Sequence, residues 1–370
     1  MEITRIIHPI GQGAFYTESI CIYDKVYNIV YDCGSGSNPN PCKVLTQEIY
    51  SYYREEDEID ILFISHFDND HINGISKLRN RVSKIKNIVV PLIEERDYWF
   101  YNLENPEFQV FYGSLEDMAD HVLKISSQIE ADYVEGFDEL PHLDLSEIEN
   151  SLRKVRIIDS ATKLRLTSKC DWCYIPFNYD KEVRKNKLLD CLSSQGIDVD
   201  VFNHGVSGIE DNMKAIKVAY EGILDKDSAN KTSLILYSGG CADYYHGFQY
   251  QTSNLNYRHN RISCEGCLYF GDTDLNQYHI LRDLQCKLDY VIDRVGTIQI
   301  PHHGALKIFN NEVLDTFEAS DSYFMSFANN NPYGHPSLRV LAEVIVRGGN
   351  VYQITGNRDS AYIQVFYQHT

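Results

Sequence analysis

Residues 65–71 read Ser-His-Phe-Asp-Asn-Asp-His and hold four possible metal ligands. The four are His66, Asp68, Asp70 and His71. Zinc and manganese favour imidazole nitrogen and carboxylate oxygen, and the run follows residues 59–64, an apolar stretch of strand length. A polar loop in which Asp70 caps a helix beginning near Ile72 would explain only one of the four. The run therefore favours one half of a two-metal site.

Further candidate ligands follow other strand-like runs downstream. They are His204, Asp272, His302 and His303. A carboxylate such as Asp272 can bridge two ions about 3.5 to 4 Å apart, the spacing used by two-metal hydrolytic sites. Asp32, at another strand end, could orient a ligand histidine without touching an ion. Each residue alone could equally make a turn or cap a strand, but their recurrence after strands favours a site for two divalent ions, zinc or manganese.

The elements that must position these side chains alternate along the chain. Strand-like runs occur at residues 19–23, 26–31, 59–64, 85–91, 199–202, 233–237, 267–270, 297–300 and 323–327. Helical periodicity occurs at residues 44–55, 72–81, 211–224, 276–284 and 336–346. This order predicts the α/β or α+β class, with sheets covered by helices. Residues 92–198 show acidic helical patches at 115–130 and 181–193, so we expect a largely helical insertion within one domain spanning residues 1–370.

Composition narrows the possible functions. The chain has 53 acidic and 34 basic residues, a net charge of −19, which argues against a broad basic surface that tracks nucleic acid. No apolar run of membrane-spanning length and no signal peptide occur, so no contact with a membrane is expected. The chain has only ten cysteines in 370 residues, which favours reduced thiols over a disulfide framework. Because the cytoplasm keeps thiols reduced, we expect a cytoplasmic protein.

Two Cys-x-x-Cys pairs, at residues 170–173 and 264–267, could together close a tetrahedral zinc site. Their separation of about 90 residues weakens this interpretation. Cys267 also begins a strand that should be buried, where a free cysteine behaves as a small apolar side chain. Buried thiols are therefore the favoured reading.

Seven segments occur in the order found in the metallo-β-lactamase-like hydrolase domain of the ComEC/Rec2 type, which the chain resembles outside the insertion. They are Gly11-Gln12-Gly13, Asp32-Cys33-Gly34, the run at 65–71, Asn230-Lys231-Thr232-Ser233-Leu234, Phe270-Gly271-Asp272, Pro301-His302-His303-Gly304 and Asn331-Pro332-Tyr333-Gly334-His335-Pro336. The resemblance implies an αββα sandwich, two mixed sheets face to face with helices outside and metals at one edge.

The same resemblance implies a ligand set. It comprises His66, Asp68, Asp70, His71, His204, Asp272 and one of the pair His302 and His303. The chain departs from the family at Ala14, where an acidic residue is usual after Gly-Gln-Gly. The membrane region that accompanies the ComEC domain is absent, so the resemblance implies the hydrolase chemistry and not DNA transport.

A metal-dependent hydrolase, most simply a phosphodiesterase or nuclease acting through a two-metal-activated water, is the expected function. Asp70 is the candidate for holding that water, and His335 could donate a proton or hydrogen bond to a scissile phosphate. Asn331 and Tyr333 are further candidates for substrate binding. The expected partner is a phosphodiester in nucleic acid or a small nucleotide.

Two other functions remain open from the sequence. The acidic charge favours a hydrolase of a small ester, lactone or cyclic nucleotide. The chain could also be an interaction subunit with a hydrolase-like core, and residues 92–198 could bind a protein partner in either case.

Overall fold

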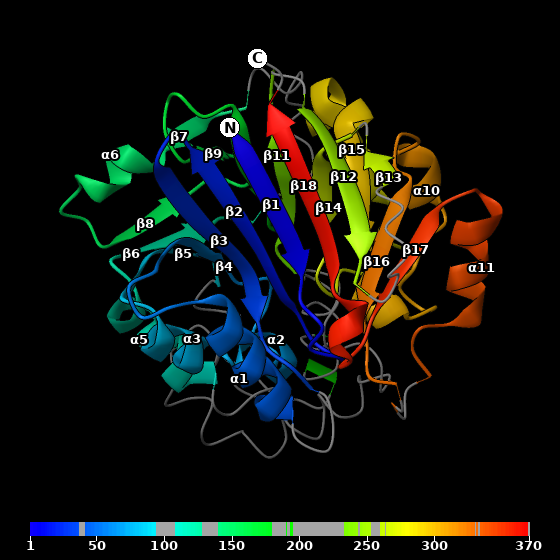
Figure 1. Cartoon of the computed structure of the whole chain (residues 1–370), viewed down its shortest axis with the longest axis horizontal. Helices are drawn as coiled ribbons and strands as arrows, with labels where there is room; N and C mark the ends of the chain where they lie inside the picture. Colours follow the sequence, from blue (N-terminus) through cyan, green and yellow to red (C-terminus); the bar gives the residue numbers. More distant parts are fainter. Residues whose placement is uncertain are drawn as a thin grey trace.

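Two mixed β-sheets form the centre of the molecule (Figure 1). The computed structural model describes residues 1–36, 41–93, 108–127, 140–179, 190, 193–194, 233–242, 245–252, 260–262, 264–329, 331 and 334–368. The first sheet contains, in spatial order, β13 (Asn260–Ile262), β12 (Tyr245–Gln251), β18 (Tyr362–Gln368), β1 (Glu2–Ile7), β2 (Phe15–Ile22), β3 (Lys25–Cys33), β4 (Glu58–Phe63), β5 (Lys84–Pro91), β6 (His121–Ile125) and β8 (Val155–Ile158). The second contains β17 (Asn350–Ile354), β16 (Ser322–Ser326), β15 (Val295–Gln299), β14 (Gly266–Tyr269), β11 (Ile235–Gly240), β10 (Trp172–Phe177), β9 (Lys163–Arg165) and β7 (His142–Asp144).

Most of the helices cover the outer faces of the two sheets. The α-helices are α1 (Pro41–Tyr52), α2 (Asn69–Ile72), α3 (Ile75–Arg81), α5 (Phe108–Met118), α6 (Leu145–Glu149), α9 (Tyr278–Lys287), α10 (Glu312–Thr316) and α11 (Leu338–Val346). Short 3-10 helices are η3 (Asp289–Arg294), η4 (His302–Gly304) and η5 (Arg358–Ser360). No helix among the described residues is both long and apolar enough to cross a membrane.

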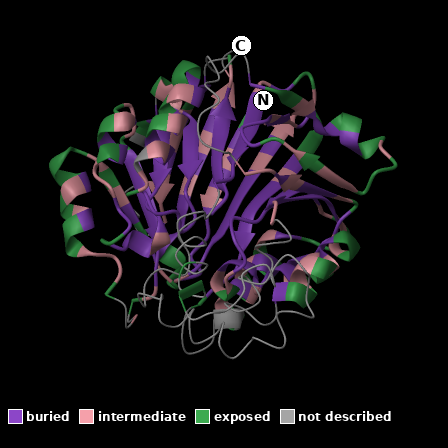
Figure 2. Cartoon of the chain, turned by 180° about the vertical axis from the view of Figure 1, so that it is seen from behind, coloured by how far each residue is buried: buried purple, intermediate pink, exposed green. Residues whose placement is uncertain are grey.

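Three apolar cores define the layers. The core between the sheets joins side chains of both, such as Tyr31 from β3 and Tyr269 from β14, whose rings stack 4.9 Å apart. A second core packs α1, α3 and α5 on the first sheet, and a third packs α9, α10 and α11 on the second. Figure 2 shows buried residues concentrated on the strands of both sheets. The order helix, sheet, sheet, helix is the αββα sandwich expected from the sequence, so that prediction is confirmed.

A buried ion pair ties the two sheets together. Arg5 on β1 donates to Glu18 on β2 over 2.6 Å, and both side chains are almost fully buried. Glu18 also accepts hydrogen bonds from Ser238, Tyr174 and Tyr269 of the second sheet. Arg5 donates in turn to the carbonyl oxygen of Glu265. These bonds fix the spacing of the sheets, because each charge keeps its partners only in this arrangement.

Parallel strands bring the predicted ligand segments to one edge. β3, β4 and β5 run parallel in the first sheet, and β14, β15 and β16 run parallel in the second. The backbone NH of Leu234 donates to the carbonyl of Ser65 over 2.8 Å and joins the sheets at this edge. The carboxyl ends of both parallel sets therefore open onto the same place.

Residues 92–198 differ from the expected, largely helical insertion. Their described part contains α5 and α6 but also β6 to β10, which extend both sheets. The helical patch expected at residues 115–130 ends at Met118, and β6 follows directly. These strands are short and buried, so their sequences are too short to show the alternation of apolar and polar residues that predicts a strand. The strand expected at 199–202 and the helix at 211–224 lie outside the described residues, as does most of 181–193.

Candidate metal centre

The run at 65–71 leaves β4 and forms the one-turn helix α2 (Asn69–Ile72) at the open edge of the sandwich. Two glycine loops pack against it. A Cβ atom on Gly13 would lie 2.4 Å from the carbonyl oxygen of Asp70, and one on Gly34 would lie 2.4 Å from the carbonyl carbon of Asp70. Gly13 also has a φ of +111°, a region that L side chains rarely adopt. These glycines therefore permit the close packing that holds Asp70 and His71 in place.

Asp32 is fully buried behind the site and orients His71. Its Oδ2 accepts hydrogen bonds from His71 Nδ1 over 2.8 Å and from the Ser65 hydroxyl over 2.6 Å. Its Oδ1 accepts from the backbone NH of Ser65 over 2.7 Å. Because Nδ1 of His71 is held by this carboxylate, Nε2 is the atom that faces the site. The role of Asp32 in orienting a metal-bound histidine stays a prediction, and these hydrogen bonds are the contacts it requires.

His66 is oriented by two serine hydroxyls. Its Nδ1 lies 2.8 Å from Ser65 Oγ and 3.2 Å from Ser233 Oγ. The Ser65 hydroxyl donates to Asp32, so it accepts from His66 Nδ1, which leaves Nε2 as the ligand atom. Ser233 also accepts the backbone NH of Asp272 over 2.9 Å and so links two candidate ligands. Sequence reasoning did not single out Ser233, although its polar side chain directly precedes β11 within a resemblance segment.

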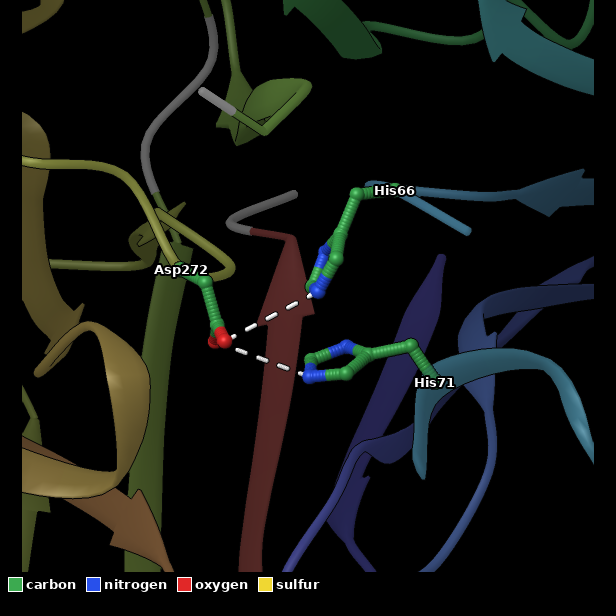
Figure 3. Close-up of side chains that lie close together, drawn as sticks. All are labelled: His66, His71 and Asp272. Carbon is green, nitrogen blue, oxygen red and sulfur yellow. Dashed lines mark ion pairs between the residues drawn. The ribbon is translucent and has the colours of Figure 1, made fainter. Parts of the chain in front are cut away.

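The first donor group comprises His66, His71 and Asp272, whose ligand atoms lie within 4.8 Å of one another. Figure 3 shows the Asp272 carboxylate facing both imidazoles. Its oxygens lie 3.7 Å from His66 Nε2 and 3.5 Å from His71 Nε2. His71 Nε2 and Asp272 Oδ1 are buried and have no hydrogen-bond partner among the residues that the structure describes. Such atoms are costly to bury, and a cation between them would satisfy both, so these residues fit a metal ion.

The second donor group comprises Asp70, His71 and His303. His303 Nδ1 donates to the carbonyl of Ser326 over 2.7 Å, and its Nε2 lies 3.3 Å from Asp70 Oδ2. His71 belongs to both groups, and Asp272 lies beside it. Only Nε2 of His71 faces the site, so His71 can bind one ion, whereas the Asp272 carboxylate could be shared by two neighbouring ions.

Charges in the site shift several pKa values. Burial raises the pKa of Asp70, but His303 and His71 outweigh it and hold the pKa well below its usual range. Burial likewise opposes ionisation of His71, yet Asp272 and Asp32 raise its pKa to about 10. In the metal-free protein His71 is therefore an imidazolium, which must lose its proton before Nε2 can bind an ion.

The Pro-His-His-Gly segment turns its two histidines in different directions. His302 and His303 both have positive φ values, +46° and +58°, which are uncommon for residues other than glycine. His303 is buried against Asp70, whereas His302 is 29% exposed and its Nδ1 lies 3.0 Å from Asp272 Oδ2. This arrangement favours His303 as the ligand and leaves His302 facing the open side.

His335 lies beside His302, with the ring centroids 5.6 Å apart. Burial, together with His302 and His303, lowers the pKa of His335 to about 4. A neutral His335 can donate an N–H hydrogen bond but is not a strong acid. The Asn331 side chain links Ala328 to His335. It donates to the carbonyl of Ala328 over 2.8 Å and accepts a hydrogen bond from the backbone NH of His335.

The remaining candidates are placed differently. Asp68 is at the rim of the first group, with its Oδ2 3.9 Å from His66 Nε2. His204 and Tyr333 lie outside the described residues. Cys170 and Cys267 lie in the core between the sheets and Cys173 lies on the other side of the second sheet. Within the described part of the chain, the two groups above are the only sets of three or more metal donors, and neither contains a cysteine.

Comparison with known proteins adds one structural likeness. The metallo-beta-lactamase fold protein YhfI from Bacillus subtilis matches 99% of this chain and 100% of its own, with a TM-score of 0.41 and 8% sequence identity. No family model and no curated protein matches the sequence. The fold assignment rests on the sheet order and the three cores of the chain itself.

Proposed function

We propose that the chain is a metal-dependent hydrolase of the metallo-β-lactamase superfamily that cleaves a phosphodiester. The observation that carries the proposal is the pair of donor groups around His71 and Asp272, with unsatisfied buried ligand atoms at the open edge of an αββα sandwich. We assign His66, His71 and Asp272 to one ion, with Asp68 at its rim. Asp70 and His303 serve the other.

In this proposal the two ions act as they do in other two-metal hydrolases, by activating a water and stabilising charge on the substrate. Two bound zinc or manganese ions lower the pKa of a water and neutralise charge that develops on an attacked phosphate. ComEC-like specificity and the identity of the metals are part of the proposal.

The side chains have separate tasks in this proposal. Asp70 accepts a hydrogen bond from the attacking water, since its lowered pKa keeps it an acceptor. His302 faces the open side and contacts a phosphate oxygen. His335, neutral at pH 7, donates an N–H hydrogen bond to the same group. Asp32 and Ser233 position the ligand imidazoles and do not touch the substrate.

The test uses the full chain stripped with chelator and reloaded with zinc or manganese. Hydrolysis of bis-(p-nitrophenyl) phosphate, single-stranded DNA, RNA and cyclic nucleotides is measured. We expect activity only after reloading and its loss in His71→Ala. The exposed His142, on β7, gives a matched control, and His142→Ala should retain full activity. Activity in the stripped protein or in folded His71→Ala would refute the proposal.

A second candidate is a hydrolase of a small ester, lactone or cyclic nucleotide. The net charge of −19 favours it, because polyanionic nucleic acid is repelled while a small substrate is less affected. Chromogenic esters in the same panel separate the two functions. A protein partner for residues 92–198 and a cytoplasmic location stay predictions of the sequence.

A further inference from the structure

Helix α11 (Leu338–Val346) has apolar side chains on both of its sides. Val340 and Val344 are buried in the core outside the second sheet. The opposite side carries four exposed residues, Leu338, Ala342, Ile345 and Val346. Leu338 and Val346 are 83% and 84% exposed. At 3.6 residues per turn the four form one continuous outward stripe, where a surface helix normally presents polar side chains.

The position of α11 leaves this stripe accessible. The helix lies at the outer edge of the molecule, beyond β17 (Figure 1). The 60% exposure of Ile345, in the middle of the last turn, shows that the described part of the chain leaves the stripe uncovered. A contiguous apolar stripe of this kind marks an interaction site rather than a solvated surface.

We propose that α11 is the contact between two copies of this chain, which pair with their helices antiparallel about a twofold axis near Ala342. A twofold contact requires a self-complementary surface, and α11 is one. The small Ala342 at the axis lets the helix backbones approach closely. Leu338 at one end of the stripe then packs against Val346 of the second copy, and the contact repeats on the other side of the axis.

The charges beside the stripe are also self-complementary. Arg339 and Glu343 are one turn apart on the same flank, and antiparallel pairing about Ala342 brings each within about 3 Å, measured along the helix axis, of the other residue in the second copy. Arg339 has no ion-pair partner among the described residues, whereas Glu343 accepts from Arg347 over 2.8 Å. The twofold contact therefore gives the Arg339 of each copy an acidic partner, Glu343 of the other copy. This arrangement favours a second copy as the occupant, because a second copy supplies a carboxylate for Arg339 within the same contact that buries the stripe.

The contact is small, so the dimer is weak. Nine helical residues span only about 14 Å. The area that such a short helix can bury is therefore well below the roughly 800 Å² per partner that a stable complex buries. We expect the dimer to form only well above micromolar concentrations, because contacts smaller than the standard size are weak and transient. Leu338 follows His335 by three residues, so the contact begins close to the loop at the rim of the metal centre.

Sedimentation velocity on the full chain, at about 5 µM and about 500 µM, tests the proposal. The wild type should be monomeric at the lower concentration and mostly dimeric at the higher one. Ile345→Lys should remain monomeric throughout. Leu152 is a matched control, exposed but far from α11 in sequence, and Leu152→Lys should dimerise like the wild type. Circular dichroism confirms that each variant is folded.

The charge pair gives a second, independent readout. Arg339→Glu should weaken the dimer at least tenfold, and the double exchange Arg339→Glu with Glu343→Arg should restore it. A wild type that stays monomeric at the higher concentration overturns the proposal. So does equal loss in Leu152→Lys, or binding to phosphatidylcholine and phosphatidylserine vesicles through α11 without self-association.

Discussion

Replacing Asp32 by asparagine tests whether the buried carboxylate controls which nitrogen of His71 can bind an ion. Asp32 accepts hydrogen bonds from Ser65 and His71 through both carboxylate oxygens. The asparagine side chain offers one oxygen and one NH₂ group in the same space. If the oxygen keeps the backbone NH of Ser65, the NH₂ group faces His71 Nδ1.

When His71 loses one proton, its Nδ1 must then accept, so the remaining proton stays on Nε2, the atom that faces Asp272 over 3.5 Å. That tautomer has no lone pair at Nε2 for an ion. Loss of such a supporting carboxylate lowers metal affinity by about 10- to 100-fold, or about 1.4 to 2.7 kcal/mol at 1.36 kcal/mol for each factor of ten.

Zinc titration of the stripped protein against a fluorescent chelator of known affinity measures the change. Asp60 provides the matched control, because it is buried on β4 and bonds to Lys86 and Asn28 away from the site. Asp60→Asn should lose stability but keep its metal affinity. A folded Asp32→Asn variant that binds zinc as tightly as the wild type would refute the reasoning.

Four further predictions concern pH, packing and stability. Because the pKa of His71 is about 10 without metal, binding of a metal ion should release about one proton. The metal affinity should therefore rise up to tenfold for each pH unit towards pH 10. Calorimetry in two buffers measures both the affinity and the number of protons released. Protonated His71 stabilises the metal-free fold, and this contribution is fully present below pH 6.5 and is lost as the pH rises through 10. The melting temperature of the metal-free protein should therefore fall over that pH range in thermal melts. Gly34→Ala should abolish metal binding because its Cβ meets the Asp70 backbone, while Gly113→Ala, with open space around it, should bind normally. Arg5→Met leaves Glu18 buried without its cation and should cost about 3 to 5 kcal/mol in urea unfolding; a loss below about 1 kcal/mol would contradict the role given to this pair.

Much of the site was predictable because its signals are local. The run at 65–71 and the segment ending in Asp272 each follow a strand, and strand ends of parallel sheets meet at one edge. The αββα layers followed from the resemblance together with the alternation of strands and helices.

Other features depended on contacts that the sequence does not display. The choice between His302 and His303 depends on two consecutive positive φ values, and the role of Ser233 depends on His66 approaching it from the other sheet. β10 was missed because its six residues are all buried and include Pro176, so it shows neither alternation nor a clean strand composition. The ligand role of His204 stays a prediction.

The ligands enter the growing chain in two separate stretches. Residues 66–71 are synthesised first, and Asp272 and His303 follow about 200 residues later, roughly 10 to 40 s at ribosomal speeds. β1 waits longer still for β18, its neighbour in the first sheet. An ion captured early by the nascent chain would meet only half of its donors and exchange freely. A complete set of donors is therefore present only after His303 has been synthesised, late in translation and before β18 completes the first sheet.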